Sequence, residues 1–158
     1  MLITLMKADK LDVLKGFFGE VFLPEAVFSE VTSNDAFFDE AVRIRNSDYI
    51  KIVKVINLDR VDFLQRATGL DRGESEAIVF ADETNADLLL MDEAAGRKVA
   101  QNMKLPMTGS VGILVRAFQA GLIPVDEIDD VFDKIRNSNR HISEKLIQSA
   151  LEAIHGDK

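Results

Sequence analysis

The chain has 158 residues, of which 47% are hydrophobic and 29% are charged, and its formal net charge is -8 at pH 7. This length suffices for one domain with a substantial core, and no apolar run approaches the length of a membrane span. The absence of cysteine excludes disulfides, thiolate catalysis and cysteine-ligated metal sites. The acidic balance argues against a large basic nucleic-acid surface, but carboxylates that hold divalent cations also make a nuclease acidic.

Short strands and helices are predicted to alternate, which favours an α/β fold with a mainly parallel sheet flanked by helices. Glycines at 19, 69 and 121 are expected to end helices, and Ser33-Asn34-Asp35 offers a helix cap. In chain order we expect a helix over residues 8–18, a strand over 20–23, a helix from Pro24, a helix over 37–46, a strand over 49–56, a helix over 59–67, a helix over 71–81, a strand over 88–91, a helix over 93–102, a strand over 105–107, a helix over 110–120 and two helical segments from Val125.

The whole chain, residues 1–158, is expected to form a single domain. Ile123-Pro124 is the only late boundary, so residues 124–158 are predicted to be a helical C-terminal extension packed on the domain. The apolar N-terminus lacks a preceding basic region and a small-residue cleavage site, so we expect a cytoplasmic protein without a signal peptide.

The stretch from Asp71 to Glu93 is predicted to carry the chemistry. It begins as a polar helix entry followed by apolar residues at helical spacing, and it continues as a buried strand that stops at Asp92. A buried parallel strand delivers side chains at its carboxyl end, so Glu76, Asp92 and also Glu74 are candidates for one cleft.

Four ordered motifs resemble a known family, the PIN-like domains close to the VapC-type toxins. The resemblance covers nearly the whole chain, although each motif is short. The motifs are residues 23–31 (LPEAVFSEV), 73–78 (GESEAI), 89–93 (LLMDE) with Gly96-Arg97, and 108–112 (TGSVG).

The resemblance implies a PIN-like three-layer fold in which acidic side chains bind Mg²⁺ or Mn²⁺ and cleave single-stranded RNA. Carried over by position, Glu30, Glu76 and Asp92 are the expected catalytic acids and metal ligands, and Glu74 is a further possible ligand typical of this branch. Metal-activated water needs no covalent nucleophile, which suits a chain without cysteine or a Gly-x-Ser-x-Gly motif. A toxin of this type is expected to pair with a small antitoxin and often to form a homodimer, with no membrane partner.

One departure from the family pattern concerns the N-terminus. Members usually open with a strand that ends in a catalytic Asp, and Met1-Leu2-Ile3-Thr4-Leu5 aligns just after that Asp. Three explanations are open: a start codon assigned too late, true loss of the strand, or replacement by another segment. The departure motivates the alternative function, a catalytically inactive PIN-like module that binds a protein partner or RNA.

Each candidate acid also has a structural interpretation. Asp92 is suited to cap a helix that starts at Glu93, and Glu30 is suited to a solvent-facing position. Glu74 and Glu76 lie about 200° apart on a regular helix, so they do not both point into one site. We therefore favour Glu76 as the ligand, while Glu74 suits a helix cap or a salt bridge.

Overall fold

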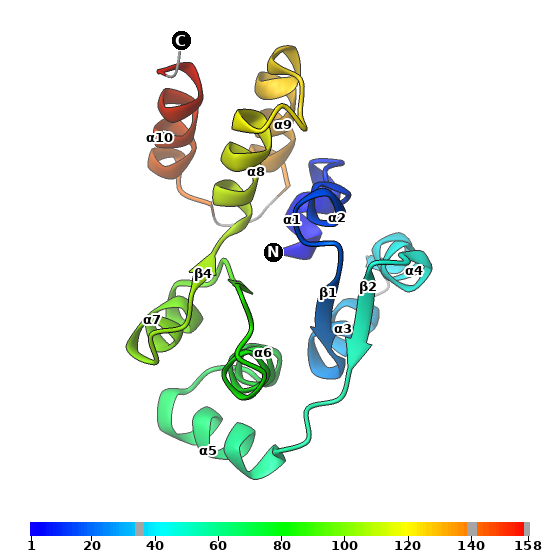
Figure 1. Ribbon diagram of the computed structural model, residues 1–158, viewed down its shortest axis with the longest axis vertical. Coiled ribbons are helices and arrows are strands. Elements are labelled where there is room, and N and C mark those ends of the chain that lie inside the picture. Colours follow the sequence, from blue (N-terminus) through cyan, green and yellow to red (C-terminus); the bar gives the residue numbers. More distant parts are fainter. Residues whose placement is uncertain (34–36, 139–141, 157–158) are drawn as a thin grey trace. The chain divides into compact units, whose positions relative to one another are not determined.

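The computed structural model describes residues 1–33, 37–138 and 142–156 (Figure 1). The chain divides into two compact units, one comprising residues 18–107 and the other residues 1–17 with 108–158. Within the described ranges, every helix is too short or too polar to cross a membrane.

The unit of residues 18–107 combines short strands with helices. Its elements are β1 (Val21–Pro24), α3 (Glu25–Thr32), α4 (Phe38–Asn46), β2 (Ile50–Val53), α5 (Leu58–Thr68), α6 (Arg72–Glu83), β3 (Leu89–Leu90), α7 (Ala94–Asn102) and β4 (Met107–Thr108), whose last residue belongs to the other unit. The predicted α/β class is confirmed.

The strands form two pairs in the part of the chain that the structure describes. β1 and β2 run parallel, in a register that places Val21 beside Ile50 and Pro24 beside Val53. β3 pairs with β4. The predicted parallel pairing is therefore confirmed, whereas one continuous sheet is not formed among these residues.

Helix α6 organises the core of this unit. It contacts α3, α5, α7, β1 and β3. Its residues Ile78 and Ala81 belong to a buried apolar cluster with Leu89, Met91 and Ala100, and Val79, on another side of the helix, packs with Val55 and Val61. Apolar residues on several sides of α6 fix its rotation, which in turn fixes where its acidic side chains point.

The other unit is helical in its described part. Its elements are α1 (Leu2–Lys7), α2 (Val13–Phe18), whose last residue belongs to the unit of residues 18–107, α8 (Ser110–Gln119), η2 (Val125–Glu127), α9 (Ile128–Arg136) and α10 (Glu144–His155). α8 contacts α10 and α1, and the rings of Phe118 and Phe132 stack with centroids 6.4 Å apart. The expected boundary at Pro124 lies inside this unit, and the single-domain arrangement stays a prediction.

The N-terminal segment corrects the predicted secondary structure. The helix expected over residues 8–18 begins only at Val13, because Asp9 adopts a left-handed conformation with φ of 56° that interrupts the helix. Helix α1 was not predicted because Leu2 to Met6 are all buried and show no one-sided apolar pattern.

Most predicted helix ends agree with the structure. Gly19, Gly69 and Gly121 have φ near +70°, as expected for glycines that follow a helix. Pro24 is the N-cap of α3 rather than its first residue, and Ser33 is the C-cap of the same helix. The other two residues of the predicted cap at 33–35 lie outside the described residues.

Candidate functional site

Helices α3 and α6 cap each other's N-termini. The Gly73 N–H, at the second position of α6, donates to Glu30 Oε1 of α3 at 3.1 Å, and the Ala26 N–H, at the second position of α3, donates to Glu76 Oε2 of α6 at 3.1 Å. The first N–H groups of a helix have no partner within the helix, and the helix dipole favours negative charge there. Because the N-cap residue of α3 is Pro24, which has no side-chain donor or acceptor, the carboxylate of Glu76 fills that role. The exchange of caps fixes both predicted acids in place.

The approach of Glu30 to α6 requires glycine at position 73. A Cβ added to Gly73 would lie 2.9 Å from Glu30 Cδ and closer still to Oε1, well inside normal contact distance. The glycine therefore lets the carboxylate reach the helix backbone directly.

Glu76 is a buried carboxylate with a cationic partner. The residue is 5% exposed, and its Oε1 atom accepts a hydrogen bond from Arg72 Nε at 3.1 Å. Arg72 Nη1 also donates to Asp62 Oδ1 of α5 at 3.3 Å. Burial of a carboxylate is costly unless it has hydrogen bonds and a countercharge, and Glu76 has both.

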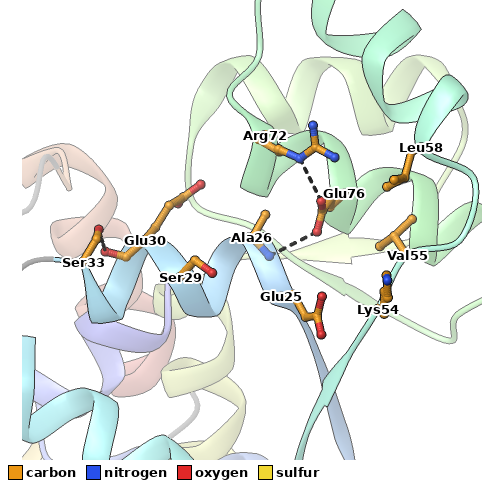
Figure 2. Close-up of a pocket in the computed structure, with 10 residues that line it drawn as sticks. All are labelled: Glu25, Ala26, Ser29, Glu30, Ser33, Lys54, Val55, Leu58, Arg72 and Glu76. Atoms are coloured by element: carbon orange, nitrogen blue, oxygen red, sulfur yellow. Dashed lines mark hydrogen bonds and ion pairs between the residues drawn. The ribbon is translucent and has the colours of Figure 1, made fainter.

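Both glutamates line one pocket of about 530 Å³ (Figure 2). Figure 2 shows Glu76 between Arg72 and the first turn of α3, with Lys54 on the neighbouring segment that follows β2. The lining residues are Glu25, Ala26, Ser29, Glu30, Ser33, Lys54, Val55, Leu58, Arg72 and Glu76. Three carboxylates and two cations leave the pocket with a net negative charge.

The electrostatics of the pocket disfavour a negative charge on Glu30. Burial raises the pKa of its carboxyl above the usual 4.5, the charge of Asp71 raises it further, and Glu76 adds to the effect. The hydrogen bond from Gly73 acts in the opposite direction. Crowding of negative charge raises the pKa of a carboxyl and attracts a cation for the same reason.

Glu74 lies elsewhere and caps its own helix. Asp71 accepts from the Glu74 N–H at 2.7 Å, and the Glu74 carboxylate accepts from the Asp71 N–H at 3.4 Å, which forms a capping box. The same carboxylate approaches α7, where a Cβ on Gly96 would lie 3.0 Å from Oε1. Burial, followed by the charge of Asp71, raises the pKa of Glu74. The capping interpretation of Glu74 is confirmed, and Glu74 does not line the pocket.

Asp92 follows β3, as expected, but it does not line the pocket either. Its interpretation as a helix cap is wrong, because the N-cap of α7 is Glu93. The Oδ2 atom of Asp92 is buried, and Arg97 Nη1 donates to the carbonyl of the preceding Met91 at 2.9 Å, which fixes the turn that carries Asp92.

Of the three expected catalytic acids, Glu30, Glu76 and Asp92, only Glu30 and Glu76 line the pocket. Among residues 1–33, 37–138 and 142–156, no three acidic or histidine side chains are grouped so that they could share a metal ion. Glu30 and Glu76 nevertheless offer hard oxygen donors in one negative pocket. Mg²⁺ is commonly held by one or two carboxylates together with water and substrate phosphates, so these two side chains are of the donor type that such an ion takes.

Three residues of the site were not predicted from the sequence to take part in it, namely Lys54, Arg72 and Gly73. Arg72 lies four residues before Glu76, so their spacing on one helix face was a readable signal. The roles of Lys54 and Gly73 depend on contacts between segments distant in the sequence, for which no local pattern exists.

Comparison with known proteins identifies the family. A family model described as a PIN domain matches residues 1–155. No curated protein and no solved structure matches the chain significantly. The chain therefore belongs to the PIN-domain family, a nuclease-type fold.

Proposed function

We propose that this protein is a metal-dependent endoribonuclease that cleaves single-stranded RNA, with Glu30 and Glu76 as ligands of Mg²⁺ or Mn²⁺. The observation that carries the proposal is the pairing of these two acids in one negative pocket of a PIN domain. Each acid is held by a backbone N–H at a helix N-terminus. Such contacts order a carboxylate before any ligand arrives, which lowers the cost of binding.

The chemistry divides between the protein and the ion. A bound divalent cation acidifies a water molecule and stabilises charge on the phosphate oxygens. Glu30 and Glu76 supply its protein ligands, and Ala26 and Gly73 fix their orientation. Lys54 lies exposed on the pocket wall, where its ammonium group is suited to bind a phosphate oxygen of the RNA. Asp92 and Glu74 do not line the pocket, and their roles as metal ligands remain predictions from the sequence.

A cleavage assay on single-stranded RNA with Mn²⁺ tests the proposal. We expect cleavage by the wild type, loss of it with a chelator, and a decrease of at least about 100-fold in Glu76→Gln, since the effect of a ligand acid is large. Glu83→Gln is the matched control, because Glu83 lies on the same helix and pairs with Arg60 outside the pocket. Asp92→Asn is measured in the same assay, because Asp92 is also an expected metal ligand. Cleavage that survives Glu76→Gln unchanged would refute the assignment.

A second candidate function is a catalytically inactive module that binds RNA or a protein partner. The observation that favours it is that both oxygens of Glu76 already accept hydrogen bonds from Ala26 and Arg72. An RNA-binding measurement with Mn²⁺ present separates the two candidates. Binding without any cleavage by the wild type would support the inactive module.

The charge of the pocket also suggests the chemistry of a protein partner. We propose that a small antitoxin offers a basic side chain to the pocket, because complementary charge favours association there. Antitoxin variants that lack their basic residues should bind more weakly, and undiminished binding would contradict this proposal. A homodimer is the expected assembly, and sedimentation of the purified protein tests it.

A further inference from the structure

The position of Arg72 is not explained by the stability of its own helix. Arg72 is the first residue of α6, where the helix dipole disfavours a positive charge. It precedes Glu76 by four residues, and a base before an acid is the weaker order for such a pair. The position of Arg72 is therefore better explained by what its guanidinium contacts than by any stabilisation of α6.

The two partners differ in how easily they can move. The Glu76 side chain is 7% exposed, whereas the Arg72 side chain is 46% exposed and reaches Asp62 on α5 as well. Glu76 Oε2 is held by the backbone of α3, so Oε1 is the oxygen that remains for a further ligand. Arg72 Nε occupies that oxygen at 3.1 Å.

We propose that Arg72 is the internal counter-ion of Glu76, and that Arg72 and a divalent cation exclude each other at Oε1. This inference rests on the proposed metal site. Arg72 neutralises the buried carboxylate in the cation-free protein and thereby prevents the cost of an unpaired buried charge. When a cation binds, the guanidinium leaves Glu76 and keeps its contact with Asp62. The contact consequently weakens cation binding and protects the empty site.

Calorimetric titration of Mn²⁺ into the wild type and into Arg72→Gln tests the competition. We expect Arg72→Gln to bind Mn²⁺ about fivefold more tightly, which corresponds to about 1 kcal/mol and to the strength of a partly exposed ion pair. Arg60→Gln is the control, because Arg60 also joins α5 to α6, through Asp82 and Glu83, but does not line the pocket. Its affinity for Mn²⁺ should equal that of the wild type.

A second measurement uses the wild type alone and does not depend on the folding of a variant. Nuclear magnetic resonance should detect faster hydrogen exchange at Arg72 Nε–H as diamagnetic Mg²⁺ is added, with no change at Arg60 Nε–H.

The outcomes separate the two proposals. Tighter Mn²⁺ binding by Arg72→Gln, or loss of protection at Arg72 Nε–H, supports the competition. Equal or weaker binding by a folded Arg72→Gln, or unchanged protection at saturating Mg²⁺, overturns the competition while the metal site stands. Absence of Mn²⁺ binding by both the wild type and the variant overturns the metal site itself and the competition with it.

Discussion

Substitution of Gly73 by alanine tests the contact between α3 and α6, because the substitution should destabilise this protein whereas it stabilises an ordinary helix. In an ordinary helix this substitution stabilises by about 0.5–1 kcal/mol, because alanine has the higher helix propensity. Here the new Cβ would lie 2.9 Å from Glu30 Cδ, so the carboxylate must leave and its hydrogen bond with the Gly73 N–H is lost. A hydrogen bond to a charged group contributes about 1.5 kcal/mol at the lower end of its range. We expect Gly73→Ala to destabilise the protein by about 0.5–1 kcal/mol, the difference between these terms.

A double-mutant cycle makes the test specific. In a Glu30→Ala background the carboxylate is absent, so Gly73→Ala should stabilise by about 0.5–1 kcal/mol. Urea unfolding followed by circular dichroism measures all four free energies of unfolding. If Gly73→Ala stabilises both backgrounds equally, Glu30 does not approach Gly73 and the reciprocal capping of α3 and α6 is refuted.

Three further predictions concern stability. Glu30→Gln mimics the protonated side chain. Because the pKa of Glu30 is raised in the folded protein, the protonated carboxyl contributes stability that is present below pH 4.5 and is lost as pH rises through the native pKa. Wild type and Glu30→Gln should therefore be equally stable near pH 4, and at pH 7 the variant should be more stable by under about 1 kcal/mol in urea unfolding; a more stable wild type at pH 7 would contradict this. Asp71→Ala removes the capping box of α6 and should cost about 1 kcal/mol in the same assay. Phe132→Ala empties a fully buried position in α9 and should cost about 3–5 kcal/mol, measured by thermal unfolding, whereas a cost below about 1 kcal/mol would show that the position is not buried.

The parts of the fold that could be predicted from the sequence are those with local causes. The capping box of Asp71 and Glu74 and the glycines that end helices depend on residues a few positions apart, so their patterns are readable. Helix α1 could not be predicted, because a helix that is buried on all sides has no amphipathic pattern.

The candidate site was predictable only in its residue types. The pattern of helix and strand predicts Glu76 and the family motifs predict Glu30, but their partners Ala26 and Gly73 lie 50 and 43 residues away in the sequence. Asp92 was correctly expected after a short strand, yet its distance from the pocket depends on how β3 and α7 pack. Motif order predicts which acids matter, and packing decides which of them meet.

Calorimetric titration of Mn²⁺ into the wild type, Glu76→Gln and Glu83→Gln measures whether the pocket of Glu30 and Glu76 holds a metal ion. We expect binding by the wild type and by Glu83→Gln, and loss of binding by Glu76→Gln, because Glu76 lines the pocket and Glu83 does not. Equal binding by all three proteins, or no binding by the wild type, would contradict a metal site at Glu30 and Glu76.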